Sequence, residues 1–198
     1  MMKKVIMGTM VLLFLIGMGI AEEEEGKKLM IADFNSGKKP SNIGGDFGAW
    51  EKDPRDFDET CMISFFSTDK VGEKGFSLRV DYDVDSPRPA WNGVWFKLNG
   101  ADFRPYDTLN LWIKGDPVKG FTTVFKIELK NSQGEVGKKY ITGIEPKWKK
   151  FSIPFSEFMG ITDFSSMEEL VFVFEDRIAT KKTGAIYVDE IYVSKEEK

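Results

Sequence analysis

Apolar and polar residues alternate one by one in several segments of this chain, the pattern of a β-strand with one buried and one solvated face. The clearest segments are 76–83, 93–98, 109–114 and 124–130, and further strands are expected at about 29–34, 61–66, 148–153, 169–175 and 184–193. Turn residues such as Asn99-Gly100 separate the strands. Helix is expected only in a short piece, 156–159 or 165–169. Eight or nine strands at this spacing predict an all-β fold, a two-sheet antiparallel β-sandwich of the jelly-roll type.

The N-terminal segment has the order of a secretory signal peptide. Lys3 and Lys4 precede an apolar run over 5–20, and the small residues Gly19 and Ala21 precede a run of glutamates. An uncleaved membrane anchor is the alternative, but about 16 residues is short for a bilayer. We therefore expect a signal peptide over 1–21 and export to the periplasm or the cell exterior. The mature chain would have solvated tails at 22–28 and 194–198 around one domain at 29–193, with no membrane insertion.

Composition excludes several classes of function. The chain contains no histidine, which rules out Ser-His-Asp triads, His-ligated zinc and imidazole acid–base chemistry. Without Lys3 and Lys4 the net charge is −6, so nucleic acid is not expected as a partner. The single cysteine, Cys61, forms no intramolecular disulfide and is interpreted as a small buried side chain.

The order of motifs resembles a known group of sandwiches. These motifs are Ile31-Ala32-Asp33-Phe34, Gly48-Ala49-Trp50, Trp91-Asn92-Gly93-Val94-Trp95, Leu109-Asn110-Leu111-Trp112 and Tyr187-Val188-Asp189. The chain is similar to galactose-binding-like jelly rolls, particularly the family 11 type carbohydrate-binding modules. It also resembles the related fold of the complex I intermediate-associated protein family. The first resemblance implies a sugar ligand on a concave sheet face and a structural calcium ion near the chain ends.

Tryptophans in the polar register of the strands are the sharpest local signal. Trp95 and Trp112 alternate against apolar neighbours, and Trp148 alternates against Phe151 and Ile153. Exposed aromatic rings usually mark a contact surface, and a sugar ring can stack on an indole. Charged residues of the same polar register could bind the sugar hydroxyls: Arg79, Asp81, Lys97, Lys126 and Glu128. Covered tryptophans and a plain solvated sheet face are the alternatives.

Other candidate residues receive simpler interpretations. Trp50 is interpreted as a plug over the sandwich edge, and Trp91 remains unassigned. The glycine-rich segment 42–50 is expected to be a loop, because it lacks the residues of a phosphate-binding loop. Asp33 and Asp189 lie on the first and last strands, which often meet in a jelly roll, and could supply oxygens to calcium. Acids at a strand edge are an equally good interpretation.

Three functions remain open from the sequence. The first is a non-catalytic carbohydrate-binding module that recognises a poly- or oligosaccharide. The second is an exported module that binds a protein partner, and the third is a carboxylate-dependent glycosidase. The tryptophans and the resemblance favour the first, and we therefore expect no enzymatic activity.

Overall fold

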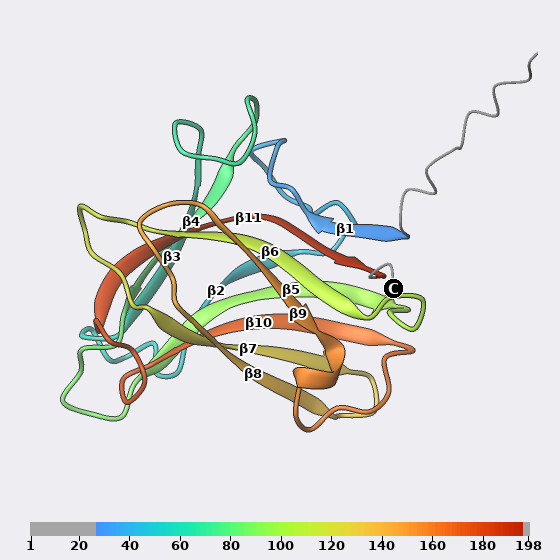
Figure 1. Cartoon of the computed structure of the whole chain (residues 1–198). Helices are drawn as coiled ribbons and strands as arrows, with labels where there is room; N and C mark the ends of the chain where they lie inside the picture. The colour runs from blue at the N-terminus through green and yellow to red at the C-terminus, as the bar shows by residue number, and fades with distance from the viewer. Residues whose placement is uncertain (1–26, 196–198) are drawn as a thin grey trace, which may run out of the picture.

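In the described part of the chain, eleven β-strands form two antiparallel sheets that stack face to face (Figure 1). This computed structural model describes residues 27–195 of the chain. The expected signal peptide and the expected tails lie outside the described residues, except for 27–28 and 194–195, of which Lys28 and Ser194 belong to the first and last strands and not to tails. The predicted fold class, an all-β two-sheet sandwich, is confirmed.

The sheets differ in size and are named here A and B. Sheet A contains β1 (Lys28–Ala32), β3 (Thr60–Phe66), β4 (Ser77–Asp83), β6 (Thr108–Gly115), β9 (Lys149–Pro154) and β11 (Thr183–Ser194). Its order is β3-β4-β11-β6-β9, and β1 also pairs with β11, beyond the segment that pairs with β4. Sheet B contains β2 (Phe47–Glu51), β5 (Trp91–Ala101), β7 (Val124–Asn131), β8 (Val136–Thr142) and β10 (Met167–Glu175). Its order is β2-β5-β10-β7-β8.

The core consists of the apolar positions of the alternating strands. Val80 and Val94 are fully buried between the sheets, as are their alternate neighbours on β4 and β5. Tyr82 of sheet A stacks on Phe174 of sheet B, with ring centroids 4.1 Å apart. Cys61 is buried as predicted, and burial raises the pKa of its thiol. Burial of each large side chain is worth about 1.5–3 kcal/mol, so this pattern fixes which face of each strand turns inward.

Two local predictions are wrong. The segment 42–50 is a loop only in its first half, because Phe47–Glu51 forms the edge strand β2. Segment 165–169 is not helical: β10 begins at Met167, where its hydrogen bonds to β5 and β7 outweigh the local helix signal. The only helical turn of the described chain is the 3₁₀ helix Phe155–Glu157. It begins one residue before the other predicted helical piece, 156–159, and overlaps it.

The outer face of sheet A contacts a loop, whereas the outer face of sheet B is hollowed. The loop 67–76, between β3 and β4, rises on the outer side of sheet A (Figure 1), and its Val71 amide donates a hydrogen bond to Asp189 Oδ2 of β11 at 2.8 Å. The outer face of sheet B carries a series of hollows instead. Within residues 27–195 no helix has the length and apolar character needed to cross a membrane.

Candidate functional site

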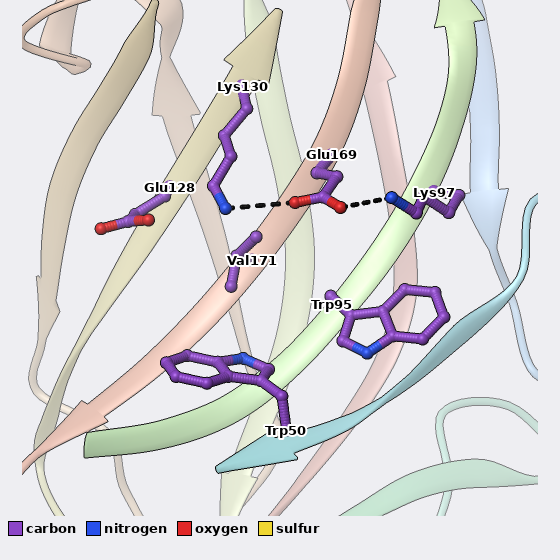
Figure 2. Close-up of a pocket in the computed structure, with 7 residues that line it drawn as sticks. All are labelled: Trp50, Trp95, Lys97, Glu128, Lys130, Glu169 and Val171. Carbon is purple, nitrogen blue, oxygen red and sulfur yellow. Dashed lines mark hydrogen bonds and ion pairs between the residues drawn. The ribbon is translucent and has the colours of Figure 1, made fainter. Parts of the chain in front are cut away.

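Three tryptophans lie on the outer face of sheet B. Trp91 and Trp95 occupy outward positions of β5, and Trp50 occupies an outward position of β2. Trp50 is paired directly with Gly93, and Trp95 is paired with Gly48. Across the β2–β5 pairing, Trp50 and Trp95 thus each face a residue without a side chain, and Figure 2 shows their two rings near one another on this face.

Ion pairs cross the same face from strand to strand. Glu169 of β10 lies between Lys97 and Lys130 (Figure 2). Its Oε1 is 2.5 Å from Lys97 Nζ, and its Oε2 is 3.1 Å from Lys130 Nζ. Burial raises the pKa of Glu169, but its bonds to these two lysines outweigh burial and hold the pKa below its ordinary value. The face therefore presents fixed polar groups beside the tryptophans.

A second ion-pair group lies further along the face. Lys126 of β7 is 3.1 Å from Glu128 and 3.0 Å from Glu175. Burial lowers the pKa of Lys126, but the hydrogen bonds to the two carboxylates outweigh burial and raise it. The Tyr140 hydroxyl of β8 donates to Glu175 Oε2 at 2.9 Å. Three lysines and three glutamates of the two groups balance in charge.

The hollows between these residues form one groove. A hollow of about 370 Å³ is lined by Trp50, Trp95 and the ion pairs of Glu169 with Lys97 and Lys130 (Figure 2). It shares Trp50 and Glu128 with a hollow of about 330 Å³, which reaches Trp91. A third, of about 370 Å³, extends past Trp91 to Tyr140. Aromatic side chains therefore line the groove along much of its length.

The structure divides the predicted sugar-binding residues between the two sheets. Those on the outer face of sheet B are Trp95, Lys97, Lys126 and Glu128. Those on the side of sheet A are Arg79, Asp81, Trp112 and Trp148. Trp148 lies in the loop before β9, not on the strand expected at 148–153, and its Nε1 donates to Asp69 of the covering loop at 3.0 Å.

The charged pair on sheet A belongs to a half-buried ion cluster. Arg79 Nε is 2.8 Å from Asp81, and its Nη1 is 2.5 Å from both Asp116 and the Tyr187 hydroxyl. These partners occupy the donors of the guanidinium group. Arg79 and Asp81 are thus bonded to one another and to their neighbours on sheet A, and of the predicted sugar-binding residues only those of sheet B line the groove.

Sequence reasoning did not assign several groove residues. Trp50 is not an edge plug, because it lies on β2 with its indole in the groove. Trp91 shares the odd-numbered register of Trp95, which was a usable signal. Glu169 and Glu175 are outward positions of β10, a strand whose unbroken apolar run 170–174 conceals the alternation. Val171 and Val173 point outward yet are only 3% exposed, because the groove side chains surround them.

Asp33 and Asp189 lie at the other side of the molecule. Asp189 is 2% exposed, and no lysine or arginine of residues 27–195 forms an ion pair with it. The pKa of Asp189 is raised to about 7, chiefly by burial and also by the charges of Glu190 and Asp33, and two amide hydrogen bonds oppose this rise. Asp33 accepts hydrogen bonds from Asn35 and Asn42. No group of three or more acidic or cysteine side chains within the described residues could hold a metal ion.

An open groove lined with tryptophans on a jelly-roll sandwich is the architecture of a carbohydrate-binding module. Residues 45–195 match the family Carbohydrate binding domain 30, and the chain belongs to this family. A comparison with curated proteins gives no match.

Solved structures share the fold. The family 11 module of the cellulosomal cellulase Lic26A-Cel5E of Clostridium thermocellum is 20% identical, with a TM-score of 0.63 over 87% of this chain and 97% of that chain. A family 11 module from Clostridium thermocellum, in complex with a β-1,3-1,4-mixed-linked tetrasaccharide, is 18% identical, with a TM-score of 0.63 over 86% and 97%. A family 30 carbohydrate-binding module is 19% identical, with a TM-score of 0.58 over 86% and 99%.

These comparisons confirm the predicted jelly roll and the resemblance to family 11 modules. The fold relation to the complex I intermediate-associated protein family stays a prediction.

Proposed function

We propose that the outer face of sheet B is the glycan-binding face of this module. The observation that carries the proposal is the pair of indoles, Trp50 and Trp95, placed next to each other in an open groove over cross-strand glycines. The axial C–H groups of a sugar ring pack on such an indole, and its equatorial hydroxyls reach polar groups at the ring edge. Lys97, Glu128 and Glu169 are placed to serve as those polar groups.

The balanced charges favour a neutral glycan. Each lysine of the two ion-pair groups already has a carboxylate partner, so a charged sugar would have to compete for it. A β-linked glucan presents flat apolar ring faces without charge, and one structural neighbour is in complex with a β-1,3-1,4-mixed-linked tetrasaccharide. We therefore choose mixed-linked β-glucan as the first ligand to test.

The proposed module binds its glycan without cleaving it. A glycosidase needs a carboxylic acid with a raised pKa as its general acid. Glu169 of the groove has a lowered pKa instead, because Lys97 and Lys130 stabilise its carboxylate. Export by the segment 1–21 would bring the module to polysaccharides outside the cytoplasm.

The test is glycan affinity, measured by calorimetry, after removal of one indole. Trp95→Ala should weaken binding of mixed-linked β-glucan by about 1–3 kcal/mol, the range for a stacked aromatic contact. Trp112→Ala, on the opposite sheet, is the matched control and should leave the affinity unchanged. Equal affinity of Trp95→Ala and the wild type would refute the assignment of this face, as would a loss confined to Trp112→Ala.

A structural calcium ion at Asp33 and Asp189 is the second proposal. It is supported by the buried Asp189 carboxylate, which has no basic partner within residues 27–195. Calcium accepts six to eight oxygen ligands. Asp33 and Asp189 would supply the side-chain oxygens, and backbone carbonyls would have to supply others. When bound, the ion would neutralise the two carboxylates and stabilise the fold, away from the groove.

A further inference from the structure

Gly48 occupies a strand position that does not require glycine for its backbone. It lies within β2, and it is not among the glycines with positive φ. Glycine in a strand interior weakens the strand, because its backbone loses more conformational entropy on folding and it provides no side chain to pack. The presence of glycine at this position therefore needs another reason.

That reason is the indole of Trp95. A Cβ atom built on Gly48 would lie 2.9 Å from Trp95 Cζ2, 3.2 Å from Cε2 and 3.4 Å from Nε1. These three ring atoms are its nearest neighbours, and no backbone atom is among them. Gly93 differs, because a Cβ there would lie 1.8 Å from the carbonyl oxygen of Phe172. Strand packing thus requires glycine at 93, whereas at 48 the first obstacle is a ring of the groove.

We propose that Gly48 is a positioning residue of the glycan site. The missing side chain lets the Trp95 indole rest against the backbone of β2, and this contact sets the position of the ring on which a sugar stacks. The proposal rests on the proposed function and assigns to Gly48 a role in affinity rather than in folding. A methyl group at this position would displace the ring, because the side chain is free to move and the backbone is not.

The experiment combines Gly48→Ala with a smaller ring at position 95. Gly48→Ala should weaken binding of mixed-linked β-glucan by about three- to tenfold, less than the loss of the indole itself. In a Trp95→Phe background the same change should have no effect, because the shorter ring leaves room for the methyl group. Gly72→Ala is the control for a methyl group added outside the groove: a Cβ there meets no atom within 4 Å, and its φ of +77° makes the change strain the backbone of that loop alone. It should leave glycan affinity unchanged.

A second readout does not depend on binding. The Nε1–H resonance of Trp95, assigned by its absence in Trp95→Phe, should shift in Gly48→Ala and not in Gly72→Ala. An unshifted resonance would overturn the proposal, and so would equal losses of affinity in the Trp95 and Phe backgrounds. If the wild type binds no glucan but the resonance shifts, the proposed function fails while the control of the ring by Gly48 is supported. If the wild type binds and Gly48→Ala binds equally well, the positioning proposal alone is overturned.

Discussion

The buried carboxylate of Asp189 should make the stability of this protein depend on pH. Its pKa is about 7 in the folded protein, chiefly because of burial, and about 3.9 in an unfolded chain. Below pH 4 the group is protonated in both states and causes no loss of stability. As the pH rises from 4 to 7, the unfolded chain ionises first, so the folded state progressively loses stability. Above pH 7 the loss is complete and amounts to about 4 kcal/mol.

The perturbation that isolates this effect is Asp189→Asn. The amide has no titrating proton, so the free energy of unfolding of the variant should not show this loss between pH 4 and 7. The carboxylate accepts amide hydrogen bonds from Val71 and Glu190, and an amide oxygen with its NH₂ group can replace only one of them. The variant should therefore be destabilised at pH 4 by about 1–3 kcal/mol, an offset that does not change with pH.

The assay is urea denaturation at several pH values from 4 to 8.5, followed by tryptophan fluorescence in the presence of a chelator. The difference between the wild type and Asp189→Asn should narrow or reverse as the pH rises. Parallel curves for the two proteins would refute the reasoning, because they would show that Asp189 has the same pKa in the folded and unfolded states.

Calcium provides the second arm of this experiment. A bound cation should restore stability to the wild type at pH 8, by about 2.7 kcal/mol at a hundredfold excess over its Kd. Asp189→Asn and Asp33→Asn should remove this gain. A wild-type melting curve that neither calcium nor chelator changes would refute the calcium proposal and leave the pH prediction standing.

Two further predictions concern the core and the N-terminus. The buried Thr122 amide donates a hydrogen bond to the Tyr82 hydroxyl at 2.6 Å. Tyr82→Phe removes this acceptor and should lower the free energy of unfolding, measured by urea denaturation, by about 1–3 kcal/mol. An unchanged denaturation midpoint would contradict this role of the hydroxyl. N-terminal sequencing of the protein from its native host should begin at Glu22, whereas intact Met1 in the cytosol would refute the signal peptide.

The alternation of apolar and polar residues was sufficient to predict the sandwich. A one-residue slip of β5 would expose Val94 and Phe96 to water, so the sequence determines which side of that strand faces the core. The same alternation placed Trp95 and Lys97 on an outer face. The side of a strand that turns toward the core follows from the alternation of that strand alone, and for this reason it can be predicted from local sequence.

The composition of the groove was decided by the tertiary structure. Trp95 and Trp112 have the same local pattern, but β5 belongs to sheet B and β6 to sheet A. Sheet membership depends on hydrogen bonds between strands far apart in the chain, as between β5 and β10. The alternating pattern contains no information on these pairings.

The cross-strand neighbours of the tryptophans show the same limit. Gly48 lies in a sequence that is typical of a loop, and only its pairing with Trp95 gives the glycine a role within a strand. The sequence by itself determined which side chains turn away from the core, because hydrophobic burial selects the register of each strand. Only the tertiary structure decided which of those side chains meet, because strand pairing brings residues 48 and 95 into direct contact.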